Sequence, residues 1–144
     1  HDNVIATLSL KNLLMGSIIK KDIIRNDKQK MHKGIKNINM LLYKLSKHLF
    51  PDLAVIDGYN GMQGNGPTHG TKVEHRIAIS SISPLSADIV ALKCMSIKPE
   101  NVGYINYIKE ERKPSYIVNG ENLSKCIKKY QPHKTIKAQL NWRY

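Results

Sequence analysis

The sequence lacks the features that would anchor it in a membrane or let it hold an iron–sulfur cluster. No apolar run approaches the roughly 20 residues that a transmembrane helix needs, and no signal-peptide pattern is present. The only two cysteines, Cys94 and Cys126, are far apart in the sequence. Because such clusters usually take about four cysteines, we expect none held by this segment alone. We also expect no membrane association and a reducing, cytoplasmic compartment.

Acidic residues are scarce as well. The chain has 11 Asp and Glu against 23 Lys and Arg, a formal net charge of +12. Such a charge raises the question of nucleic-acid binding. Only four of the cations are arginines, the residue that base reading and bidentate phosphate binding favour. We interpret the scattered lysines, with a local excess after Glu121, as a solvated basic face.

The 144 residues are enough for one domain with a hydrophobic core. An apolar segment predicts a helix over about residues 5–15, and the charged stretch 20–34 is interpreted as a mobile loop. From Ile35 to Pro51 the pattern predicts an amphipathic helix. Its stripe consists of Ile38, Leu41, Leu42, Leu45 and Leu49.

Two strands are predicted around a glycine-rich stretch. The short apolar run 53–57, bounded by Pro and Gly, indicates a buried strand. Residues 72–81 alternate and indicate a second strand. Its predicted inward positions are Val73, His75, Ile77 and Ile79.

Further helices and a third strand are predicted downstream. Ser83 is suited to cap a helix whose first residue is Pro84, and Pro99 is suited to open another. Residues 115–120 indicate a strand and 121–130 a short helix.

The order of these elements predicts one α/β domain over residues 1–144, with a short, mainly parallel sheet flanked by helices and an irregular tail at 131–144. The chain opens at His1 without a Met, and no strand precedes the first helix. We therefore expect an incomplete portion of a larger α/β domain, truncated at its N-terminus.

The stretch VIDGYNGMQGNGPTHG, residues 55–70, is the most distinctive part of the sequence. A loop that follows the carboxyl end of a buried strand is where open α/β sheets bind ligands, and glycine-rich turns can form an amide nest for an anion. The alternative is a tight surface loop whose glycines serve only turn geometry. The stretch lacks the lysine of a P-loop.

Several candidate polar side chains fall in or beside this stretch. Asp57 could bind a cation, position a proton or cap the loop amides, and Asn65 is also typical of left-handed turns. His69 and His75 could be metal ligands or proton carriers, although His75 could equally be a hydrogen-bonded core histidine. The grouping of Asp57, Asn65 and His69 supports a pocket hypothesis.

The motif PDLAVIDGYNGMQGNGPTHG resembles the signature of a family called domain of unknown function 362, whose members read P-D-L-x-V-x-D-G followed by G-M-E-G-N-G-P. HDNVIATLSLKNLLMG and AISSISPLSADIVALKCMSI resemble flanking segments, so the resemblance runs from His1 to about Asn119. The chain departs from the family pattern at three positions, where it has Gln63, Ser83 and Ser96.

The resemblance implies no agreed activity, although many members are described as iron–sulfur proteins, and whether this chain is an enzyme stays open. The positions that match the family pattern are His1, Lys11, Asn12, His32, Asp57, Gly64, Asn65, Gly66, Pro67 and Asp88. The candidate catalytic residues are His32, Asp57 and His69. The candidate ligand-binding residues are Lys11, Asn12, Gly64, Asn65 and Gly66. The candidate metal ligands are His1, His32 and Asp57.

The leading hypothesis is that the chain binds a small anionic ligand or a metal-associated cofactor at residues 58–70, with a role linked to redox chemistry. One alternative is a basic module that binds nucleic acid or an acidic partner. Another is a degenerate structural remnant, suggested by Gln63 and Ser83, which replace acidic residues of the family pattern.

Overall fold

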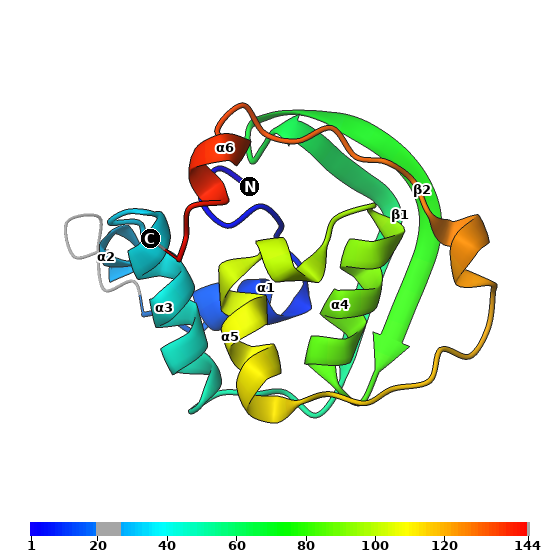
Figure 1. Ribbon diagram of the computed structural model, residues 1–144, viewed down its shortest axis with the longest axis horizontal. Helices are drawn as coiled ribbons and strands as arrows, with labels where there is room; N and C mark the ends of the chain where they lie inside the picture. Colours follow the sequence, from blue (N-terminus) through cyan, green and yellow to red (C-terminus); the bar gives the residue numbers. More distant parts are fainter. Residues whose placement is uncertain (20–26, 144) are drawn as a thin grey trace.

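The computed structural model describes residues 1–19 and 27–143, and it consists of short helices packed beside one β-hairpin (Figure 1). The mixed helix and strand content predicted from the sequence is confirmed. No helix in the described ranges is long and apolar enough to cross a membrane. The elements are α1 (Ser9–Gly16), α2 (Asp27–Met31), α3 (Ile35–Ser46), β1 (Ala54–Asn65), β2 (His69–Ser81), α4 (Pro84–Cys94), η1 (Pro99–Asn101), α5 (Gly103–Arg112), η2 (Leu123–Cys126) and α6 (Ile136–Gln139).

The sheet consists of two antiparallel strands, so the prediction of a mainly parallel sheet is wrong. Pairing runs from Ala54 opposite Ser81 to Asn65 opposite His69. Antiparallel strands can be joined by a few residues, and here the chain reverses within residues 66–68. Most of the predicted glycine-rich loop is therefore strand, because glycine can adopt extended backbone as readily as turn conformations.

One face of the hairpin is directed toward the helices and the other toward solvent, as the two-residue period of a strand requires. In β2, His75 is buried and Ile77 and Ile79 are half-buried, which confirms their predicted inward phase. In β1, Ala54 is buried but Val55 is 68% exposed. The prediction of a strand buried on both faces is therefore wrong, since an antiparallel sheet can leave one face in water.

The main hydrophobic core is formed by α1, α3, α4 and α5. Figure 1 shows the hairpin curving past one side of α4, with α3 and α5 on its other side. Ile38 and Leu42 of the predicted stripe in α3 are fully buried, which confirms that helix. Helix α4 is buried on nearly all sides, because it lies between the hairpin and the other helices.

The predicted start of α4 is confirmed, whereas the predicted start of α1 is wrong. Ser83 caps α4 by accepting a hydrogen bond from the amide of Ser86, and Pro84 is the first helical residue. Helix α1 begins at Ser9 rather than near residue 5, where Ile5 has a φ of 65°. A β-branched residue with positive φ is incompatible with a helix.

The charged stretch 20–34 is described only in part. Residues 20–26 lie outside the described residues, so the loop interpretation is not tested there. The five residues that follow form α2, and the interpretation is wrong for them.

The last third of the chain departs most from the predictions. Residues 115–120 form no strand, the predicted helix 121–130 is reduced to the short η2, and the tail predicted to be irregular contains α6. In Figure 1 this part of the chain passes outside β2 and returns to the N-terminus. There the side chain of Gln139 hydrogen-bonds to the backbones of His1 and Ile5.

Candidate functional site

A cleft of about 520 Å³ lies between the N-terminal segment and the hairpin, and we call it the edge cleft. Nearly every residue of β1 from Val55 to Gly64 lines it, whichever face its side chain is on. Strand β2 contributes only inward-facing positions, His75, Ile77 and Ile79. The cleft therefore follows the edge of β1 that no strand in the described residues pairs with. Residues 5–9 line it from the N-terminal side, and Tyr130 of the C-terminal third also lines it.

The edge cleft brings together five residues predicted to belong to the site. They come from the start of the chain, from α1, from β1 and from the turn that follows it. They are His1, Asn12, Asp57, Gly64 and Gly66. The fold thus brings residues of the glycine-rich stretch together with residues that lie far from it in the sequence.

Two predicted ligand-binding residues are held elsewhere. Lys11 is only 6% exposed. Burial lowers the pKa of its ammonium group, although the nearby carboxylate of Asp2 acts in the opposite direction. The side-chain oxygen of Asn65 accepts a hydrogen bond from the backbone amide of Lys134. Neither residue lines the edge cleft.

The two remaining histidine candidates lie apart from each other. His69 is at the start of β2, exposed at the hairpin turn, where its Nδ1 atom is 2.9 Å from the hydroxyl of Thr68. His32 follows α2 and faces His1 across a centroid distance of 6.1 Å. Of the three catalytic candidates, only Asp57 lines the edge cleft itself.

Two of the glycines have structural reasons that the sequence could not reveal. A Cβ atom at Gly61 would overlap the hydroxyl of Tyr130, and Gly64 has a φ of 73°. Two backbone amides of the predicted anion nest, those of Gly64 and Gly66, are used within the fold. The amide of Gly64 donates to the carbonyl of Gln131, and the amide of Gly66 donates to the carbonyl of Gly64.

The buried His75 is a fully hydrogen-bonded core histidine. Its Nε2 atom lies 2.7 Å from the carbonyl oxygen of Cys126, which can only accept, so Nε2 carries a proton. Its Nδ1 atom lies 3.0 Å from the hydroxyl of Tyr130, which donates to it. Burial raises the pKa of Tyr130, so the hydroxyl keeps that proton. The core interpretation of His75 is confirmed.

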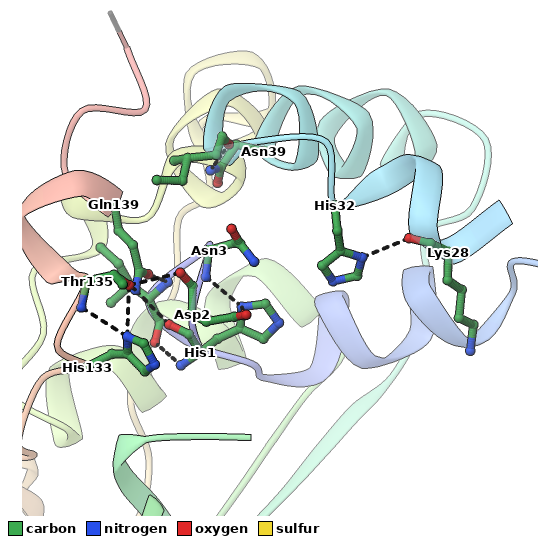
Figure 2. Close-up of polar contacts among 11 residues, drawn as sticks. His1, Asp2, Asn3, Lys28, His32, Asn39, His133, Thr135 and Gln139 are labelled. Carbon is green, nitrogen blue, oxygen red and sulfur yellow. Dashed lines mark hydrogen bonds and ion pairs between the residues drawn. The ribbon is translucent and has the colours of Figure 1, made fainter. Parts of the chain in front are cut away.

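The N-terminal wall of the cleft is held by residues of the tail that sequence reasoning missed. Figure 2 shows His1 and Asp2 beside Thr135 and Gln139. The hydroxyl of Thr135 donates to the carbonyl of Asp2, and the side-chain amide of Gln139 donates to the carbonyl of His1. Both contacts join residues more than 130 positions apart, and no local sequence signal predicts them.

Asp88 has a structural role in a helix other than its own. Its carboxylate accepts hydrogen bonds from the amide and hydroxyl of Ser9 and from the amide of Leu10, the first residues of α1. It therefore caps the start of α1, although it belongs to α4. Burial raises the pKa of Asp88 from 3.8 to about 6, although these hydrogen bonds favour its charged form.

The charges around the edge cleft limit what it can bind. Among the described residues that line it, Asp57 is the only acid and none is a Lys or Arg. One oxygen of that carboxylate accepts a hydrogen bond from the amide of Tyr59. In the described part of the chain, no group of three or more His, Cys, Asp or Glu side chains is arranged to hold a metal ion. The metal candidates His1, His32 and Asp57 therefore do not form one three-ligand site.

Comparisons with known proteins give one match. The model of a family described as "Domain of unknown function (DUF362)" matches residues 1–93. No curated protein and no solved structure matches the chain. The matched range contains the N-terminal segment and both strands of the hairpin, so it includes most of the edge cleft but not Met95 or Tyr130.

Proposed function

The chain belongs to the DUF362 family of unknown function, and from that premise we propose that it binds a small ligand in the edge cleft. The observation that carries this proposal is the convergence of His1, Asn12 and Asp57 from three segments on one cavity of about 520 Å³. Small-molecule sites typically occupy about 300–1,000 Å³ and combine apolar walls with a few polar groups.

The lining favours a metal-associated ligand over a simple anion. An anion would find no Lys or Arg in the cleft, and the two turn amides mentioned above already have acceptors. A metal-bearing group would instead meet the imidazole of His1, a common metal ligand, and Asp57 also lines the cleft although its side chain is exposed. The apolar walls, which include Ile5, Leu8 and Met95, would hold the rest of the molecule. A redox role would belong to the bound cofactor.

The test compares ligands with and without a metal. Calorimetry of the chain with citrate and ATP, each as the free acid and as its Zn²⁺ or Mg²⁺ complex, distinguishes the two ligand classes. We expect heat from at least one metal complex and none from the free acids. Equal binding of the free acids would favour the anionic ligand instead.

A blocking substitution locates the binding. Asn60 is exposed in β1 and lines the edge cleft, so Asn60→Trp should fill it and weaken binding by about tenfold or more through steric overlap. Thr71→Trp is the matched control, because Thr71 is also an exposed strand residue but lies outside the lining. Binding that survives Asn60→Trp unchanged would refute the proposal for this cleft.

The rival proposal, a nucleic-acid module, rests on the basic C-terminal third. The exposed lysines after Glu121 are Lys125, Lys128, Lys129, Lys134 and Lys137. Lys125 forms an ion pair with Glu121, and the ammonium of Lys128 donates to the carbonyl of Glu74. This proposal predicts affinity for RNA or DNA that falls steeply with salt, and no binding at low salt would dismiss it.

The degenerate-remnant proposal depends on Gln63 and Ser83. The side-chain oxygen of Gln63 accepts a hydrogen bond from the amide of Gln131, and Ser83 caps α4. A carboxylate could make either contact, so Gln63→Glu and Ser83→Asp should fold. A gain of metal-complex binding in these variants would show that the site is functional once its acids are restored, and no gain would leave the remnant proposal standing.

A further inference from the structure

The imidazole rings of His1 and His32 face each other beside the edge cleft (Figure 2). Their centroids are 6.1 Å apart and their planes are inclined by 26°. One ring comes from the start of the chain and the other from the turn between α2 and α3. The side chain of His1 is 9% exposed, whereas His32 is exposed to solvent. The pair therefore combines a largely buried ring with a solvent-exposed one.

Each ring is held through its Nδ1 atom. In His32, Nδ1 lies 2.8 Å from the carbonyl oxygen of Lys28, which can only accept, so Nδ1 carries the proton and Nε2 has a free lone pair. In His1, Nδ1 accepts a hydrogen bond from the amide of Asn3 at 3.0 Å and lies 2.9 Å from a carboxylate oxygen of Asp2. Binding of a metal ion at Nε2 would select the tautomer in which Nδ1 carries the proton and donates it to Asp2, at the cost of the hydrogen bond from Asn3.

No group in the described ranges hydrogen-bonds to the Nε2 atom of either ring. Metal-binding histidines usually present one ring nitrogen to the metal while the other donates to a carboxylate or a backbone carbonyl. His32 with the carbonyl of Lys28 reproduces one form of that arrangement, and the carboxylate of Asp2 is placed to provide the other form for His1. An ordinary ring-to-ring contact requires neither group.

We propose that His1 and His32 form a two-imidazole site for a divalent transition-metal ion such as Zn²⁺, Ni²⁺ or Cu²⁺. Imidazole ligands suit these ions, whereas Mg²⁺ and Ca²⁺ prefer oxygen ligands. A single ion with bonds of about 2.0–2.1 Å to each nitrogen requires the two side chains to rotate so that both Nε2 atoms are directed at it, and a centroid distance of 6.1 Å leaves room for the ion between them. Water completes the coordination.

The site shares His1 with the edge cleft, and the metal salt alone tests it without the organic ligand of the proposed function. His1 lines the cleft as well, so a metal ion on this ring would lie next to the proposed ligand, with coordination positions still open. The nearest charges oppose each other, because the carboxylate of Asp2 offsets the ammonium of Lys11. Metal binding at the histidine pair and ligand binding in the cleft can therefore be measured separately.

The experiment titrates the whole chain with ZnCl₂ by calorimetry in the absence of any organic ligand. We expect one equivalent of Zn²⁺ to bind, and His32→Ala to weaken binding by about tenfold or more. Asp2→Asn, which removes the carboxylate behind His1, should weaken it by about tenfold while leaving both imidazoles in place. His48→Ala is the matched control, since His48 is an exposed histidine at the end of α3 and should bind Zn²⁺ as the unmodified chain does.

Two outcomes would overturn the site. Absence of Zn²⁺ binding at millimolar concentration would do so directly. Unchanged binding in His32→Ala would show that His32 is not a ligand and that the two rings do not share the ion. X-ray absorption of the Zn²⁺ complex gives an independent result, because two imidazoles contribute scattering that water does not. The spectrum should fit two histidine ligands, and a fit to one would contradict the bridge.

Discussion

The helical layer, formed by α1, α3, α4 and α5, buries its apolar residues, whereas the hairpin leaves several of its apolar residues exposed. Helix α4 is buried on nearly all sides, and Leu92 within it has no exposed surface. Beside it, the region around β1 leaves Leu53, Val55, Tyr59 and Met62 more than half exposed. The helical layer completes its own core, whereas the hairpin has a solvated face and an edge that no described strand covers. The edge cleft lies along that edge, so the incompletely covered region is the one with room for a ligand.

The largest expected effect is a difference in how much the free energy of unfolding falls when an apolar side chain is shortened in each region. Leu92→Ala removes a fully buried side chain from the helical layer and should lower the free energy of unfolding by about 2–5 kcal/mol. Val55→Ala, in a strand position that is 68% exposed, should change it by about 0.5 kcal/mol or less. Urea denaturation measures both. Similar losses would mean that the hairpin is as well packed as the helices.

The second expected effect is a pH dependence that arises in the helical layer. The pKa of Asp88 is raised from 3.8 to about 6 by burial, so folding favours its protonated form. Asp88 therefore contributes most to the free energy of unfolding below about pH 3.8. That contribution falls by about 3 kcal/mol as the pH rises through 6.

Asp88→Asn isolates that contribution. The variant should lose less stability than the unmodified chain between about pH 4 and pH 7, and urea denaturation across that range measures the difference. Other acids titrate in both proteins and cancel in the comparison. Parallel profiles would show that Asp88 does not titrate in this range.

The third expected effect lies in the hairpin, where Gly61 packs against Tyr130. Gly61→Ala should cost about 1–3 kcal/mol through overpacking. Adding Tyr130→Phe, which removes the overlapping oxygen, should recover part of that loss in a double-mutant cycle. Gly16→Ala is the control, because a Cβ atom there meets nothing within 4 Å. Additive costs would mean that the two residues do not touch.

The smallest expected effect compares two caps. Ser83→Ala removes the cap of the buried helix α4 and should cost about 1 kcal/mol. Asn122 caps the exposed η2 through a hydrogen bond to the amide of Ser124, and Asn122→Ala should cost about 0.5 kcal/mol or less. Thermal unfolding of both variants tests the order, and a reversed order would contradict the comparison.

The sequence predicted the helical layer better than the rest because local signals decide helices. The stripe of α3 and the Ser83–Pro84 start of α4 are local patterns, and both are confirmed. The alternation of β2 was equally clear. The glycines of β1 were misleading, because they were interpreted as a loop while the structure uses Gly61 for a close contact with a distant residue.

The C-terminal third could not be predicted because its structure depends on distant partners. Residues 115–120 have strand-forming side chains but pair with neither strand of the hairpin, and Ile117 is 87% exposed. Strand propensity alone does not form a strand without an edge to pair with. Helix α6 has only four residues. The side chain of Gln139, near its end, bonds to the start of the chain, a contact that no local pattern encodes.

The predicted site residues are brought together only in part, because their positions also depend on distant contacts. His1, Asn12 and Asp57 line one cleft, although the parallel-sheet geometry that suggested a pocket was wrong. Lys11 and Asn65 are engaged in contacts within the fold. A polar residue in a distinctive motif can serve packing as readily as binding, and only the three-dimensional arrangement separates the two.

Residue-resolved amide hydrogen exchange, with and without the zinc–citrate complex, tests the central claim most directly. The account predicts that the amides of β1 that do not pair with β2 exchange rapidly in the free chain and slow when the complex is added, while those of α4 stay unchanged. Protection confined to the lysines of the C-terminal third, or no change along β1, would contradict it.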